Sequence, residues 1–159
     1  MGLDMYLSKH NRTSVYDFSK AECEATKVEI TTKTYFADGE TKEQTIVINK
    51  PSHSVHTETP VAYWRKANQI HNYFVKECGN GVDDCTRIYV SGAKLKELVD
   101  RCKMILADHT VAEKLLPTKD GFFFGSTDYD NDYLDDLRHT IDKLKDCDFD
   151  GEYIYQASW

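Results

Sequence analysis

The most chemically varied stretch of the chain is residues 63–72 (YWRKANQIHN), which holds an indole, a guanidinium, amides and an imidazole. On a helix expected over residues 61–77, Trp64, Asn68 and His71 follow the spacing i, i+4, i+7 and share one stripe. An indole offers a stacking surface, and Asn and His offer directional hydrogen bonds. Such a stripe suits recognition of a nucleobase. The alternative interpretation is a half-buried boundary between core and solvent.

A nucleotide-like ligand needs stacking rings, cations for a phosphate and polar groups for the ring edges. On one helix Arg65 points away from the Trp64 stripe, so its role requires a ligand that wraps the helix, or a second subunit. Self-association is therefore left open. The predicted ligand-binding residues are Trp64 and Tyr129 for stacking, Arg65 and Lys66 for phosphate, and Asn68, His71 and Gln156 for polar edges.

The second chemically distinct stretch is acidic. Residues 128–150 carry nine Asp against Arg138, Lys143 and Lys145, a local charge of −6. One interpretation is a solvated helix face. The other is a mimic of a phosphate backbone that occupies a basic groove on a protein partner. The predicted partner contacts are Asp130, Asp132, Asp135 and Asp136.

The start of this acidic stretch superficially resembles a calcium loop. An EF-hand requires Gly at its sixth position and Glu at its twelfth, where this chain has Tyr133 and His139. A looser metal site on Asp128 and Asp130 would serve a nucleotide hydrolase, but an acidic first turn also suits the helix dipole. No G-x-S-x-G, H-E-x-x-H or S-x-x-K motif occurs. The sequence favours a binding protein over an enzyme and predicts no cofactor.

The elements that must position these residues follow from periodicity and turn signals. Strands are expected at residues 3–7, 87–90, 121–125 and 152–159, with a β-hairpin over 27–50 turning at Asp38-Gly39 and a polar loop over 51–60. Helices are expected over 61–77, after Ser91 and from near Asp130, with a short turn ending before Pro117. The pattern predicts one α+β domain over residues 1–159, with a mixed or antiparallel sheet and about three main helices.

Composition limits the function classes. The chain has 159 residues, 40% hydrophobic and 30% charged, with a net charge of −7. This charge disfavours nucleic acid and anionic lipid as partners, and no apolar run approaches the ~20 residues of a membrane span. Five cysteines without a C-x-x-C pair indicate reduced thiols in a cytoplasm.

Five blocks of the sequence together resemble a family of small uncharacterised proteins from bacteriophages and bacterial mobile elements. The blocks are residues 1–7 (MGLDMYL), 63–71 (YWRKANQIH), 115–118 (LLPT), 121–130 (GFFFGSTDYD) and 155–159 (YQASW). They cover about half of the chain, and residues 8–60 do not contribute.

The resemblance implies a setting in the bacterial host cytoplasm and a role against host defence, but no catalytic residues. Two functions fit that setting. The first is a protein that binds a nucleotide-like signal without turnover. The alternative is an acidic inhibitor that blocks a host defence protein directly, and a metal-dependent nucleotide hydrolase is a third hypothesis.

Overall fold

The computed structural model describes residues 2–14, 28–35, 41–48 and 54–159, and the side chains of residues 2–12 and 56–159. The chain divides into two compact units. The larger one combines Met1–Asn11 with Glu58–Trp159, and the smaller one is Arg12–Thr57. The predicted hairpin falls within the smaller unit, and the prediction that residues 1–159 form one domain stays a prediction.

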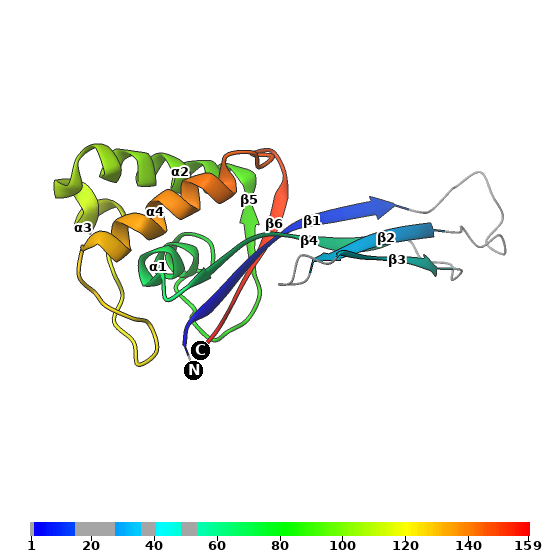
Figure 1. Ribbon diagram of the computed structural model, residues 1–159, viewed down its shortest axis with the longest axis horizontal. Helices are drawn as coiled ribbons and strands as arrows, with labels where there is room; N and C mark the ends of the chain where they lie inside the picture. The colour runs from blue at the N-terminus through cyan, green and yellow to red at the C-terminus, as the bar shows by residue number, and fades with distance from the viewer. Residues whose placement is uncertain (1, 15–27, 36–40, 49–53) are drawn as a thin grey trace. The chain divides into compact units, whose positions relative to one another are not determined.

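The described elements mix strands and helices without strict alternation, which confirms the α+β class (Figure 1). The three longer helices are α1, α2 and α4. In chain order the elements are β1 (Asp4–Ser14), β2 (Val28–Tyr35), β3 (Thr41–Ile48), β4 (Ser54–Arg65), α1 (Asn68–Glu77), β5 (Ile88–Ser91), α2 (Gly92–Ala107), the 3-10 turn η1 (His109–Val111), α3 (Ala112–Leu115), α4 (Asn131–Leu144) and β6 (Glu152–Ser158).

A four-stranded sheet in the order β4-β1-β6-β5 organises the larger unit. Strand β6 runs antiparallel to both of its neighbours. Met5 pairs with Ala157 and Leu7 with Tyr155 on one side of β6, and Val90 pairs with Tyr153 on the other. The antiparallel form of the predicted sheet is therefore confirmed.

The helices cover one face of this sheet. Figure 1 shows α1, α2 and α4 gathered on the same side of its strands. Met5 and Leu7 of β1 are buried, as is Leu3 just before the strand, while Tyr6 is half-exposed, because successive side chains of a strand point to opposite faces. Leu98 and Cys102 lie four residues apart on one face of α2 and are fully buried. One face of the sheet therefore carries the core, and the opposite face is turned away from the helices.

Two helices begin where local capping signals predict. The Ser91 hydroxyl accepts a hydrogen bond from the backbone N–H of Lys94 at the start of α2. The Asp130 carboxylate accepts one from the N–H of Tyr133, 3.1 Å away, at the start of α4. Side chains of this type satisfy backbone donors that the first helical turn leaves unpaired.

The helix predicted over residues 61–77 is wrong in its first third. Strand β4 continues to Arg65, and α1 begins only at Asn68. Ala62 and Trp64 are buried whereas Tyr63 and Arg65 are exposed, which is the period of two of a strand. At Lys66 the backbone takes a positive φ of 61°, and its N–H donates to the carbonyl of Leu3, 2.8 Å away. That contact with β1 ends the strand and delays the helix.

The loop predicted over residues 51–60 is likewise wrong from Ser54 onward, because β4 starts there; residues 51–53 lie outside the described residues. The strand predicted at residues 121–125 is also wrong. Phe124 N–H donates to the carbonyl of Gly121, 3.1 Å away, and closes a tight turn that cannot pair with a sheet. Phe122 at its tip is 94% exposed, whereas Phe124 is buried.

The smaller unit contains an antiparallel pair, β2 and β3, in register from Val28 opposite Ile48 to Tyr35 opposite Thr41. These two strands confirm the predicted hairpin arms. The predicted turn at Asp38-Gly39 lies outside the described residues.

The described thiols are free. Cys78, Cys85, Cys102 and Cys147 form no disulfide, and Cys23 lies outside the described residues. Burial raises the pKa of Cys78 to about 11 and that of Cys102 to about 12, which keeps both as inert thiols. Among the described residues, no helix has the length and apolar character needed to cross a membrane.

Candidate functional site

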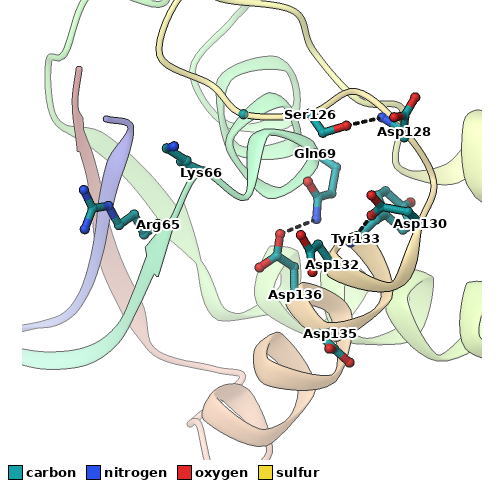
Figure 2. Close-up of a pocket in the computed structure, with 11 residues that line it drawn as sticks. Arg65, Lys66, Gln69, Ser126, Asp128, Asp130, Asp132, Tyr133, Asp135 and Asp136 are labelled. Atoms are coloured by element: carbon teal, nitrogen blue, oxygen red, sulfur yellow. Dashed lines mark hydrogen bonds between the residues drawn. The ribbon is translucent and has the colours of Figure 1, made fainter. Parts of the chain in front are cut away.

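A cavity of about 440 Å³ opens between the end of β4, the first turn of α1, the loop before α4 and the first turns of α4 (Figure 2). Its lining is strongly acidic. The carboxylates that line it are Asp128, Asp130, Asp132, Asp135 and Asp136. We call this cavity the acidic pocket.

The geometry of α4 explains why the carboxylates converge. Asp130 is the residue before the helix, and Asp132, Asp135 and Asp136 occupy its first two turns, where the spacing of three and four places side chains on adjoining rows of one face. Asp135 is exposed, and its Oδ1 accepts a hydrogen bond from Arg138 Nη1 at 2.6 Å. The ion pair partly neutralises Asp135, so the less exposed Asp136 is the more distinctive group.

Asp136 is the partly exposed carboxylate of the pocket, and it contacts a buried residue of α1. Gln69 of α1 is only 2% exposed, and its Nε2 donates to Asp136 Oδ2 across 3.0 Å. Burial raises the pKa of Asp136 to about 6, and the neighbouring charges of Asp132 and Asp135 add to this effect. The Gln69 hydrogen bond and His139 act in the opposite direction. At neutral pH Asp136 is thus an ionised carboxylate that water solvates poorly.

Two cations line the opposite wall, but they do not neutralise the carboxylates. Figure 2 shows the ends of Arg65 and Lys66 pointing away from the acidic side chains. Arg65 Nε lies 4.0 Å from Asp4 Oδ1 on β1 instead. Lys66 contributes mainly its backbone and stem to the wall, beside Gly125, which has a φ of +90°. The centre of the pocket is therefore dominated by negative charge.

Trp64 does not line a cleft. The side chain is 2% exposed, packs near Phe74 and donates its Nε1 to Thr140 Oγ1 across 2.9 Å. The reason is that Trp64 belongs to β4 rather than to the helix, so it points with Ala62 into the core. Its predicted role as a stacking surface is corrected to that of a core residue that ties β4 to α4.

Asn68 is also structural. Its Nδ2 donates to the carbonyl oxygens of Phe124 and Ser126, and its Oδ1 accepts from the N–H of Lys119. The side chain is almost completely buried, so none of it reads a ligand edge. Asn68 instead holds the loop that forms one rim of the acidic pocket.

His71 lies in a buried polar network. Its Nδ1 is 2.7 Å from the hydroxyl of Tyr155, and its Nε2 is 3.0 Å from Asp83 Oδ1. Burial lowers the pKa of His71 even though Asp83 acts to raise it. Burial also raises the pKa of Tyr155 far above its usual range, so that hydroxyl is neutral and can donate. The predicted ligand role of His71 is therefore corrected to a core role.

The two remaining candidates lie elsewhere. Tyr129 is partly exposed and packs edge-on against Tyr133 at 5.0 Å between ring centres, with its hydroxyl 3.4 Å from the N–H of Thr118. Gln156 is exposed on β6, directly opposite Tyr6 of β1. Neither residue lines the acidic pocket.

The structure thus places the predicted ligand-binding residues and the predicted partner contacts differently with respect to the acidic pocket. Of the predicted ligand residues only Arg65 and Lys66 line the pocket, whereas all four predicted partner contacts do. Gln69 was missed, because the helix expected from residue 61 turns its side chain away from the other candidates. Its contact with Asp136 joins residues 67 positions apart, which no local pattern signals.

The acidic side chains do not form a metal site among the residues described. In the parts of the chain that the structure covers, no three His, Cys, Asp or Glu side chains are arranged to hold a metal ion. Asp130 already uses Oδ1 to cap α4. The hydrolase hypothesis on Asp128 and Asp130 therefore has no ligand set there to build on.

Comparisons of this chain with protein-family models, with curated proteins and with solved structures gave no match.

Proposed function

We propose that this chain is a binding protein whose acidic pocket receives a cationic side chain, an Arg or a Lys, from a protein partner. The observation that carries the proposal is that five carboxylates line one cavity, and that one of them, Asp136, is only partly exposed and is hydrogen-bonded to the buried Gln69. In the setting that the family resemblance implies, the partner is a host defence protein and this chain is its inhibitor.

The chemistry of Asp136 favours a cation. Burial raises its pKa because the ionised form is poorly solvated, so an incoming positive charge gains more there than beside an exposed carboxylate. Gln69 holds Oδ2 in place across 3.0 Å, which fixes the direction of the acceptor. A guanidinium suits this arrangement best, because its planar fork can bond two carboxylate oxygens at once.

The same carboxylates disfavour an anionic ligand in this pocket. Five carboxylates face two cations whose charged ends point away, so a phosphate would meet net repulsion. Two residues predicted to read a nucleotide ring, Asn68 and His71, are also occupied by internal hydrogen bonds. The partner hypothesis therefore has better support at this site than the nucleotide hypothesis.

The test is a nuclear magnetic resonance titration of the full chain with N-acetyl-arginine amide. We expect chemical-shift changes at the Gln69 side-chain amide and at Gly125, and weaker changes with N-acetyl-lysine amide. The matched neutral probe is N-acetyl-citrulline amide, which has nearly the same shape without the charge and should cause no such changes.

Two variants test whether the carboxylate of Asp136 binds the arginine probe. D136N should abolish the arginine-dependent shifts, because it removes the buried charge while its amide oxygen can still accept from Gln69. The control D142N changes an exposed Asp of the same helix that pairs with Lys145 and does not line the pocket. Equal responses to the arginine and citrulline probes, or loss of binding in D142N alone, would contradict the proposal.

A further inference from the structure

We infer that the face of the large sheet opposite the helices carries a second binding site, a stacking platform for the base of a mononucleotide. The site shares Arg65 with the lining of the acidic pocket but does not depend on the function proposed for that pocket. Tyr6 of β1 and Tyr63 of β4 form its centre. Their ring centres are 5.3 Å apart and their planes are tilted by 45°.

These tyrosines are exposed on the edge strand β4 and on its neighbour β1. Tyr6 is 50% exposed and Tyr63 is 45% exposed, while their chain neighbours Met5 and Trp64 are buried on the helix side. Exposed rings side by side on a sheet offer a base a π-surface without any change in the fold, which is how sheet-based proteins stack nucleotides.

Polar groups stand where a base and its phosphate need them. Gln156 of β6 pairs directly with Tyr6, so its exposed amide lies on the same face and can bond a ring edge. The Arg65 side chain is 62% exposed and follows Tyr63 by two residues on β4, which places it on this face as well. Its guanidinium supplies a positive charge for the phosphate group.

Asp4 holds the edge of this platform in place. It accepts a hydrogen bond from the Tyr63 hydroxyl, and its Oδ1 lies 4.0 Å from Arg65 Nε. The contact orients both side chains, and the partial neutralisation of Arg65 limits the phosphate charge that the face can take. Together with the net charge of −7, this favours a mononucleotide over a single strand, whose phosphates would be repelled.

The platform continues toward β5. Ile154 of β6 is buried, yet it does not belong to the core cluster between sheet and helices, because it alternates with the core residues Tyr153 and Tyr155. It pairs with Ser8 on one side and with Tyr89 on the other. Tyr89 is highly exposed and lies edge-on to His10 at 6.3 Å between ring centres. The aromatic character of this face therefore extends across the sheet.

The test is isothermal titration calorimetry of the full chain with adenosine 5′-monophosphate, adenosine and ribose 5-phosphate as probes. We expect the monophosphate to bind, adenosine to bind more weakly, and ribose 5-phosphate to give no heat because it lacks the ring. Y6A should weaken binding of the monophosphate roughly tenfold or more, while Y6F keeps the ring and the affinity. R65Q should lower the affinity for the monophosphate and leave that for adenosine unchanged.

The control F122A removes a 94% exposed ring outside the platform and should leave binding unchanged. If Y6A fails to fold, Q156A at its exposed position replaces it, with a smaller expected loss. Absence of heat with the monophosphate at millimolar concentration, or equal affinity of wild type and Y6A, overturns the inference. Tighter, salt-dependent binding of an oligodeoxyadenylate overturns it in favour of a single-stranded ligand.

Discussion

The indole of Trp64 donates its N–H to the hydroxyl of Thr140, 2.9 Å away, and so joins the end of β4 to the middle of α4. Thr140 in turn donates to the backbone carbonyl of Asp136 across 2.7 Å. Trp64, which is buried and does not line the acidic pocket, is thus connected through two hydrogen bonds to the backbone of Asp136, which does.

Replacement of Trp64 by Phe should lower the free energy of unfolding by about 2 to 4 kcal/mol, because it leaves a cavity and deprives a buried hydroxyl of a donor. Urea denaturation measures the change. In the double variant W64F/T140V the hydroxyl is gone as well, so the two losses should not add. Additive losses would show that the hydrogen bond contributes nothing beyond packing.

Replacement of Asp136 by Asn should stabilise the protein at pH 8 and not at pH 4. The folded-state pKa of Asp136 is raised to about 6, above the unfolded value of about 3.9, so the native state holds a proton that the unfolded state releases. The stabilisation that protonated Asp136 provides is present below the unfolded pKa of about 3.9 and is lost as the pH rises through the folded pKa of about 6. Allowing for partial exposure, we expect a gain of about 1 to 2 kcal/mol at pH 8.

Urea denaturation at pH 4, 6 and 8 tests this prediction, with D142N as the exposed control on the same helix. A loss of stability in D136N at pH 8 would show that the ionised carboxylate stabilises the fold. The expected gain in stability, together with the loss of arginine binding, is the pattern of a group retained for function.

His71 should remain neutral in the folded protein below the pH at which an unfolded histidine is half protonated. Its pKa is lowered by burial, so the unfolded state takes up a proton first as pH falls below about 6.5. Stability from this group is therefore lost as pH decreases through that range. The nitrogen-15 shifts of the His71 ring measure its titration directly. A midpoint above 6.5 would mean that Asp83 outweighs burial.

Replacement of Gly125 by Ala should destabilise the protein more than replacement of Gly81 by Ala. Both glycines have positive φ, at +90° and +78°, so each substitution incurs a backbone cost of about 1 kcal/mol. Only at Gly125 would the new Cβ also approach Lys66 Cβ, at 3.2 Å, whereas at Gly81 it meets nothing within 4 Å. Thermal unfolding of the two variants measures the difference, because both carry the cost of the positive φ and only G125A adds the close approach to Lys66. Equal decreases in Tm would show that this close approach costs nothing.

Features that depend on neighbouring residues were readable from the sequence. Ser91 caps α2 through a backbone group three residues away, and α4 starts next to Asp130, as the local sequence predicts. The two arms of the predicted hairpin follow from alternation in the same way. The four residues predicted as partner contacts could be grouped from the sequence because they are concentrated at the start of one helix, and all four line the acidic pocket.

The tertiary structure decided the boundary between β4 and α1, because the hydrogen bond from Lys66 N–H to Leu3 joins residues that are distant in the chain. That boundary moved Trp64 into the core and placed Gln69 against Asp136. It likewise decided that Tyr6, Tyr63 and Gln156 meet on one face, because strand register is set by the pairing of whole strands. The sequence alone determined where the helices after Ser91 and near Asp130 begin and which residues carry the charge. Which of them face each other depended on contacts between distant segments, which no local pattern encodes.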